Sequence, residues 1–114
     1  MTAIYNALAN LTEEIRARGI AATMDPRSLR LPGALVDLDT IGPDNALCGD
    51  VTATARVTLV TGDHGHPRAI ARLTEMFMQI TDLTTGAEPA SFTLPDQGTV
   101  PALSCYPIPL DLED

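Results

Sequence analysis

The chain has 114 residues, enough for one domain built around one hydrophobic core and too few for a second domain. Apolar residues make up 45% of it but aromatic residues only 4%, so aliphatic side chains and methionines must fill that core. The formal charge of −8 repels phosphate groups, which argues against nucleic acid as a tightly bound ligand. Neither a signal peptide nor a membrane span is expected, because the first residues form neither a basic leader nor a continuous apolar run.

The first expected element is an amphipathic helix from about Thr2 to Arg18. Its apolar residues recur at helical spacing and form one stripe: Ile4, Leu8, Leu11 and Ile15. Gly19 follows, and glycine readily adopts the left-handed conformation that ends many helices. Residues 19–25 form a short apolar stretch, and the prolines and glycine within residues 25–33 predict a loop.

A half-buried strand is expected over residues 34–41, where apolar and polar residues alternate. Val36 and Leu38 take the inward positions. Asp37 and Asp39 then share the outward face.

Residues 41–50 are expected to form a connecting loop, and residues 51–61 a second, longer strand. Its alternation extends over eleven positions, which makes it the strongest strand pattern in the sequence. The residues expected to face inward are Val51, Ala53, Ala55, Val57 and Leu59.

A second helix is expected after this strand. Pro67 suits the first helical position, where no backbone hydrogen bond is lost, and His66 then takes the N-cap position. The predicted core stripe consists of Ile70, Leu73, Phe77 and Ile80, widened by Ala69 and Met76. The opposite side carries charged and polar residues: Arg68, Arg72, Glu75 and Gln79.

Two short strands, over residues 91–94 and 100–110, are expected to end the fold. The second contains three prolines, which cannot donate to a ladder, so it is predicted to be an edge strand or to join the sheet late. Residues from about 107 to 114 are then expected to be an extended tail. The order α-β-β-α-β-β predicts one α+β domain, mainly antiparallel, over residues 1–114.

The two histidines of the chain, His64 and His66, lie close to Asp63 just before the second helix. A zinc site needs three or four ligands, and no further ligands stand at a suitable spacing. The pattern therefore favours an ordinary helix start, with a small metal-binding protein using His64 and His66 as the alternative.

No other motif indicates catalysis. Asp37 and Asp39 could act as paired carboxylates only if burial separated their pKa values, and a solvated face is the simpler interpretation. Cys48 and Cys105 stand alone, without a CxxC partner, and are expected to be buried free thiols. No nucleophile or phosphate-loop motif is present, so we expect no enzyme, no cofactor and no metal.

Several apolar residues lack an obvious place in a small core. Met78 is expected on the charged side of the second helix, and Tyr5 beside the stripe of the first. Near the C-terminus Ile108, Leu110 and Leu112 alternate. These five residues are the predicted partner interface, and they indicate association between subunits.

The order of elements resembles the tail terminator family of long-tailed phages. The resemblance covers the whole chain and rests on "NALANLTEEIRARGI" as first helix, "DVTATARVTLVTGDHGHPRAIARLTEMF" as long strand, loop and second helix, and "PALSCYPIPL" as final strand. It implies an α/β virion protein without catalysis, assembled in the host cytoplasm, that forms a homo-hexameric ring capping the tail tube. Other phage neck, head–tail connector and minor tail proteins share this order.

The implied partners are the tail tube protein and a head–tail connector or stopper protein, with DNA passing through the ring. A lumen lined by carboxylates would repel DNA phosphates. Asp37 and Asp39 are the residues expected to line it, and no membrane contact is implied.

Overall fold

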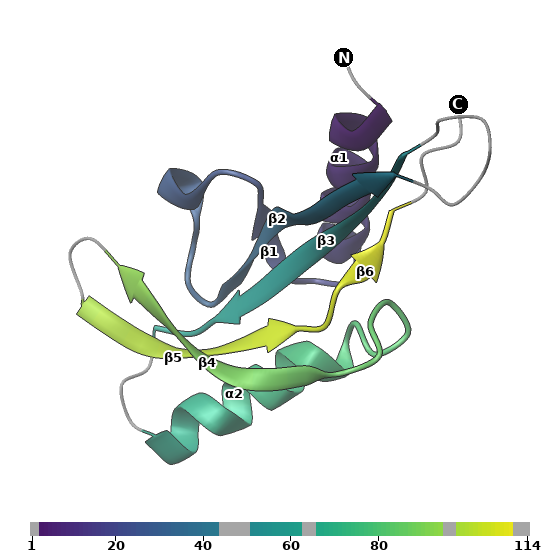
Figure 1. Ribbon diagram of the computed structural model, residues 1–114. Helices are drawn as coiled ribbons and strands as arrows, with labels where there is room; N and C mark the ends of the chain where they lie inside the picture. Colours follow the sequence, from purple (N-terminus) through teal and green to yellow (C-terminus); the bar gives the residue numbers. More distant parts are fainter. Residues whose placement is uncertain (1–2, 44–50, 63–65, 95–97, 111–114) are drawn as a thin grey trace.

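The computed structural model describes residues 3–43, 51–62, 66–94 and 98–110, and it confirms the predicted α+β fold (Figure 1). The elements in chain order are α1 (Ala3–Ala17), β1 (Ala21–Thr23), the 3-10 helix η1 (Pro26–Ser28), β2 (Gly33–Pro43), β3 (Val51–Val60), α2 (His66–Met78), β4 (Ala87–Leu94), β5 (Gly98–Cys105) and β6 (Ile108–Pro109). The strands form one mixed sheet in the order β1-β2-β3-β5-β4, and the short β6 also pairs with β3.

Helix α1 confirms the first predicted helix, but its stripe is not buried evenly. Ile15 is fully buried and Leu11 nearly so, whereas Ile4 and Leu8 are half-buried. The C-terminal half of the helix therefore provides most of its contact with the core. Gly19 has a φ of 90°, the left-handed conformation predicted for the end of this helix.

Strand β1 is an element that the sequence pattern did not identify. It pairs in parallel with the start of β2, with Ala21 opposite Gly33 and Thr23 opposite Leu35. Three residues are too few to show a two-residue period, so only the pairing with β2 defines them as a strand.

The β2–β3 hairpin confirms both predicted strands and is longer than expected. β2 continues to Pro43, two residues beyond the predicted end at Ile41. The ladder shifts between Leu38 and Thr40, so Asp39 is the extra residue of a β-bulge. The inward residues of β3 are buried as predicted where their side chains are described: Ala53, Ala55, Val57 and Leu59.

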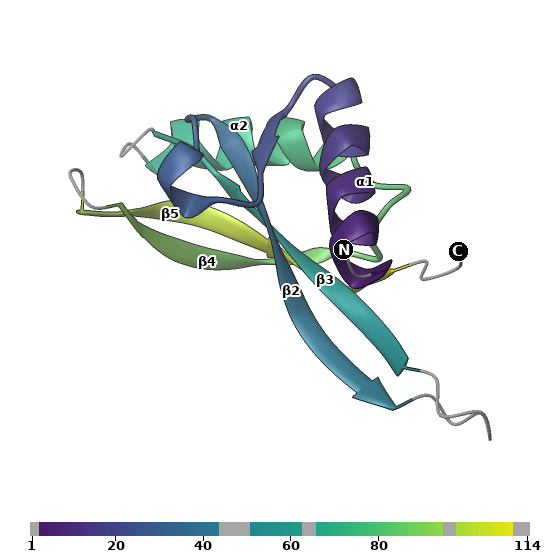
Figure 2. The ribbon, with the colours of Figure 1, turned by 90° about the horizontal axis from the view of Figure 1, so that it is seen from above.

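Beyond the bulge the hairpin continues as an arm, which we define as residues 40–43 and 51–54. Figure 2 shows it extending past both helices. Ile41, on this arm, is 53% exposed, and none of the described helices or strands covers it.

Helix α2 confirms the second predicted helix and most of its predicted core stripe. Its buried residues are Ala69, Leu73 and Met76, with Ile80 just beyond its end. Ile70, predicted as part of the core stripe, is instead 48% exposed. The buried side of the helix is therefore centred on the Ala69 and Met76 edge of the predicted stripe, and Ile70 lies at its opposite edge.

Strand β5 lies between β3 and β4, so the prediction that the final strand is an edge is wrong. The alternative, that it joins the sheet late, is confirmed, because β5 pairs with β3 only over Ala102–Ser104. Pro101 stands just before this segment and has no N–H to donate to β3. The edge on this side of the sheet is β4, which spans eight residues rather than the predicted 91–94, and β1 forms the other edge.

The chain leaves the ladder after Cys105 and returns as β6, where Ile108 pairs with Ala55. The Leu110 amide then donates to the Ala53 carbonyl at 3.0 Å. Ile108 and Pro109 are therefore part of the sheet, and Leu110 is tied to it, so this segment is not the extended tail that was expected. Residues 111–114 lie outside the described residues.

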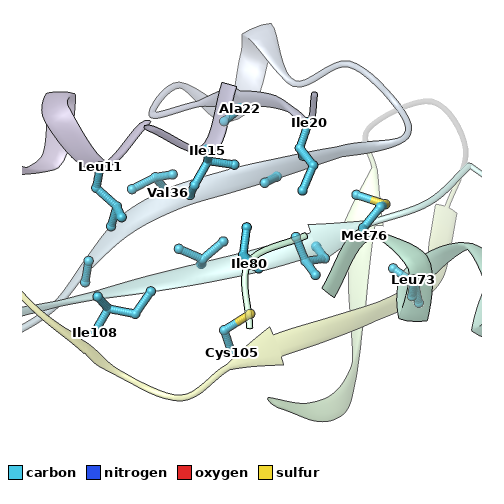
Figure 3. Close-up of a cluster of buried hydrophobic side chains, with 14 residues drawn as sticks. Leu11, Ile15, Ile20, Ala22, Val36, Leu73, Met76, Ile80, Cys105 and Ile108 are labelled. Carbon is cyan, nitrogen blue, oxygen red and sulfur yellow. The ribbon is translucent and has the colours of Figure 1, made fainter. Parts of the chain in front are cut away.

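The main core lies between the two helices and one face of the sheet (Figure 3). A smaller cluster lies on the opposite face, because Val60 alternates with Leu59 along β3. In this second cluster Val60, Val100 and Ala102 are covered by partly buried neighbours: Leu29, Leu31 and Phe92. The loop after η1 thus crosses to the side of the sheet that the helices leave open.

Arg18 joins the ends of the two helical segments. Its guanidinium donates to both carboxylate oxygens of Asp82, to the Gln79 carbonyl at 3.1 Å and to Glu14 at 3.0 Å. The hydrogen bond from Arg18 lowers the pKa of Asp82, because it stabilises the ionised carboxylate.

Candidate interaction surfaces

The histidine pair is only partly described. Helix α2 begins at His66, which confirms that this segment starts a helix. Asp63, His64 and the side chain of His66 lie outside the described residues. Elsewhere in the described chain, no group of three or more His, Cys, Asp or Glu residues could hold a metal ion. The metal-binding alternative therefore stays a prediction about residues 63–66.

Cys105 is a buried free thiol, as predicted. Burial raises its pKa to about 11, because the apolar surroundings disfavour the thiolate. A thiol that stays neutral at pH 7 is a poor nucleophile and a poor metal ligand. Cys48 lies outside the described residues.

The two aspartates of β2 share the sheet face opposite the helices, but their environments differ. Asp37 is exposed, and its Oδ1 accepts a hydrogen bond from the Leu38 amide at 2.8 Å. The side chain of Asp39 is only 14% exposed and lies 2.8 Å from Arg56 Nη2. Thr54 also donates to Asp39, at 3.2 Å. Both carboxylates thus lie on the expected outward face, but the expectation of a solvated group is wrong for Asp39, which its partners hold at the bulge.

Of the five predicted interface residues, two are not exposed and one lies outside the described residues. Ile108 is 7% exposed and belongs to the main core, and Leu110 packs against that core. Both were expected to lack a place in a small core, and that expectation is wrong, because β6 brings them under α1. Leu112 lies outside the described residues. Tyr5 and Met78 are exposed, at 40% and 63%.

The structure reveals an apolar surface on α2 that the predicted pattern did not show. It follows one flank of the helix, from Ile70 through Thr74 to Met78, at successive four-residue steps. Phe77, half-buried, lies between this row and the core, and the exposed Ala71 lies beyond it. We call these five residues the α2 flank. Met78 is exposed as predicted; its neighbour four positions earlier is Thr74, and the charged Glu75 lies three positions earlier at the border of this surface.

The charged residues of α2 lie on its other flank, where Arg68, Arg72 and Glu75 are exposed. That side faces the end of α1: a groove there is lined by Arg18, Ile20, Pro32, Arg72, Glu75, Met76 and others. The α2 flank thus lies on the side of the helix away from α1, with no charged residue among its members. Such a surface favours contact with another protein surface over exposure to water.

In the described part of the chain, neither helix is long and apolar enough to cross a membrane. Searches against protein-family models, curated proteins and solved structures give no significant match to this chain.

Proposed function

We propose that this chain is a structural phage protein, a tail terminator whose ring caps the tail tube and joins it to the head. The observation that carries the proposal is the α2 flank: Ile70 and Met78 are 48% and 63% exposed on one uncharged row. The order of elements, which resembles the tail terminator family, supports it. Another neck or head–tail connector protein, or a minor tail protein, would use such a surface in the same way.

Size argues for several contacts per subunit. A 13-residue helix is about 20 Å long, and one flank of it covers less than the roughly 800 Å² per partner of a standard interface. A ring subunit contacts a neighbour on each side, so further surface must take part. The exposed Ile41 on the arm is a second apolar position far from α2 in the sequence.

The proposal is tested by the mass of the purified protein in solution and by its appearance in negative-stain images. We expect rings in the wild type and binding to the tail tube protein. Met78→Glu should weaken association at least tenfold, because it places a charge within an apolar contact. Gln79→Glu is the matched control: it adds the same charge at the next position, on the polar flank, and should leave the mass unchanged.

Two results would count against this proposal. A wild-type protein that stays monomeric and does not bind tail tube protein would exclude the ring. If Met78→Glu and the control associate equally well, the contact lies away from the α2 flank. Metal analysis of the same sample tests the alternative, since stoichiometric zinc lost on His64→Ala would favour a metal-binding protein.

We further propose that the helix-free face of the sheet lines the channel of the ring, with Asp37 and Asp39 repelling DNA. Asp39 is bound to Arg56, so Asp37 is the position to change. Asp37→Lys should leave the ring intact and produce DNA retention that weakens as salt is added. Glu75→Lys, on the helix side of the molecule, makes the same charge change and should not. If both variants bind DNA equally well, or if neither binds DNA, Asp37 lies outside the channel.

A further inference from the structure

A hollow of about 320 Å³ lies beside β1, between the end of α1 and the loop that contains η1. Its lining residues are Arg16, Ala21, Ala22, Thr23, Ser28 and Arg30. Two arginines and no carboxylate line it, in a chain whose formal charge is −8.

Arg16 is fixed at one side of this hollow. Its Nε donates to the Ala22 carbonyl at 2.8 Å, and its Nη1 donates to Glu13 at 2.6 Å. The pair with Glu13 is exposed, so solvent screens it. Nη2 has no hydrogen-bond partner among the residues that the structure describes. The guanidinium is therefore positioned by β1 and keeps donors for a ligand.

Arg30 is fixed at the other side by its neighbours. Leu29 and Leu31 pack against the cluster around Val60 on the helix-free face of the sheet. The Arg30 backbone lies directly on Gly33, where a side chain would overlap its carbonyl oxygen. These contacts hold the loop so that Arg30 lines the hollow. The Arg30 side chain is exposed and forms no ion pair with any residue that the structure describes.

Two uncharged donors complete the lining. The Ser28 hydroxyl is exposed at the end of η1, whose start is held by the Asp25 carboxylate accepting from the Arg27 amide at 3.0 Å. That hydrogen bond lowers the pKa of Asp25, so the carboxylate stays ionised. The Ala22 amide points to the same edge of β1 as its carbonyl, because both groups of a strand residue face one side.

We propose that this hollow binds an oxyanion, a phosphate or carboxylate group of a small molecule or of a partner chain. Guanidinium groups bind both kinds of oxyanion through paired N–H donors, and the Ser28 hydroxyl and Ala22 amide add neutral hydrogen bonds. The arginines stand on separate elements, α1 and the loop, and both line the same hollow, so an anion bound there has an arginine on each side. This proposal does not depend on the ring function.

The test is a titration of the backbone amide NMR signals at constant ionic strength, with inorganic phosphate in one series and acetate in another. Saturable shifts should concentrate at Ala22, Ser28 and Arg30. The anion that binds with the higher affinity identifies the kind of ligand. Arg30→Gln should weaken binding about tenfold, the loss expected for one charge-assisted hydrogen bond. Arg30 is exposed and unpaired among the described residues, so the variant should fold normally.

Arg68→Gln is the control, because it removes the same charge from an exposed position on α2. It should change the affinity less than twofold. If Arg30→Gln and Arg68→Gln weaken anion binding equally, the anion responds only to net charge and the proposal is overturned. Signal shifts that spread over the whole molecule, or that do not saturate, would also overturn it. Ser28→Ala should give a smaller, separate loss than Arg30→Gln, because it removes a neutral donor.

Discussion

Replacing Gly33 with Ala is expected to destabilise the domain by about 3 kcal/mol or more, because the loop before β2 and strand β1 both approach this residue. A Cβ atom here would overlap the Arg30 carbonyl oxygen and lie 2.7 Å from the Ala21 carbonyl oxygen. Both obstacles are backbone atoms, which cannot rotate away as a side chain can. The parallel pairing of β1 with β2 would have to open.

Gly42→Ala is the matched control within the same strand, because a Cβ atom there meets nothing within 4 Å. Urea unfolding of the two variants measures the difference in the free energy of unfolding. Gly42→Ala should stay within about 0.5 kcal/mol of the wild type. Equal stabilities for the two variants would mean that the loop does not rest on Gly33.

Ile15→Ala is expected to cost about 2–5 kcal/mol, a large part of the stability of a domain this size. Ile15 is fully buried where α1 meets the sheet (Figure 3), and its removal leaves a cavity that surrounding backbone cannot fill. Thermal and urea unfolding should both show the loss.

Ile4→Ala, in the same helix and the same predicted stripe, should cost clearly less, because Ile4 is only half-buried. A loss for Ile4→Ala as large as that for Ile15→Ala would show that the first turn of α1 is packed as tightly as its last. The comparison separates helical pattern, which both positions share, from burial, which they do not.

Local patterns in the sequence determined both helices, the two long strands and the α+β class. Each is long enough for its period to repeat several times, so the spacing of apolar residues identifies it without knowledge of its neighbours. The left-handed Gly19 was predictable for the same local reason, since its role depends on the helix that it ends.

Only the tertiary structure decided how deeply each predicted apolar position is buried and which partners the short segments find. Ile70 fits the helical stripe, yet the packing of α2 on the sheet rotates it into solvent. Ile108 stands among prolines that suggested a loose tail, yet a two-residue pairing with β3 carries it into the core.

The hollow beside β1 could not be predicted from local sequence patterns either. Arg16 and Arg30 are separated by 14 positions, and no spacing rule relates them. A parallel strand of three residues and a loop resting on a glycine bring them to one place. Local periodicity arises from the geometry of one element, whereas such sites arise from contacts between elements, and those depend on the packing of the whole chain.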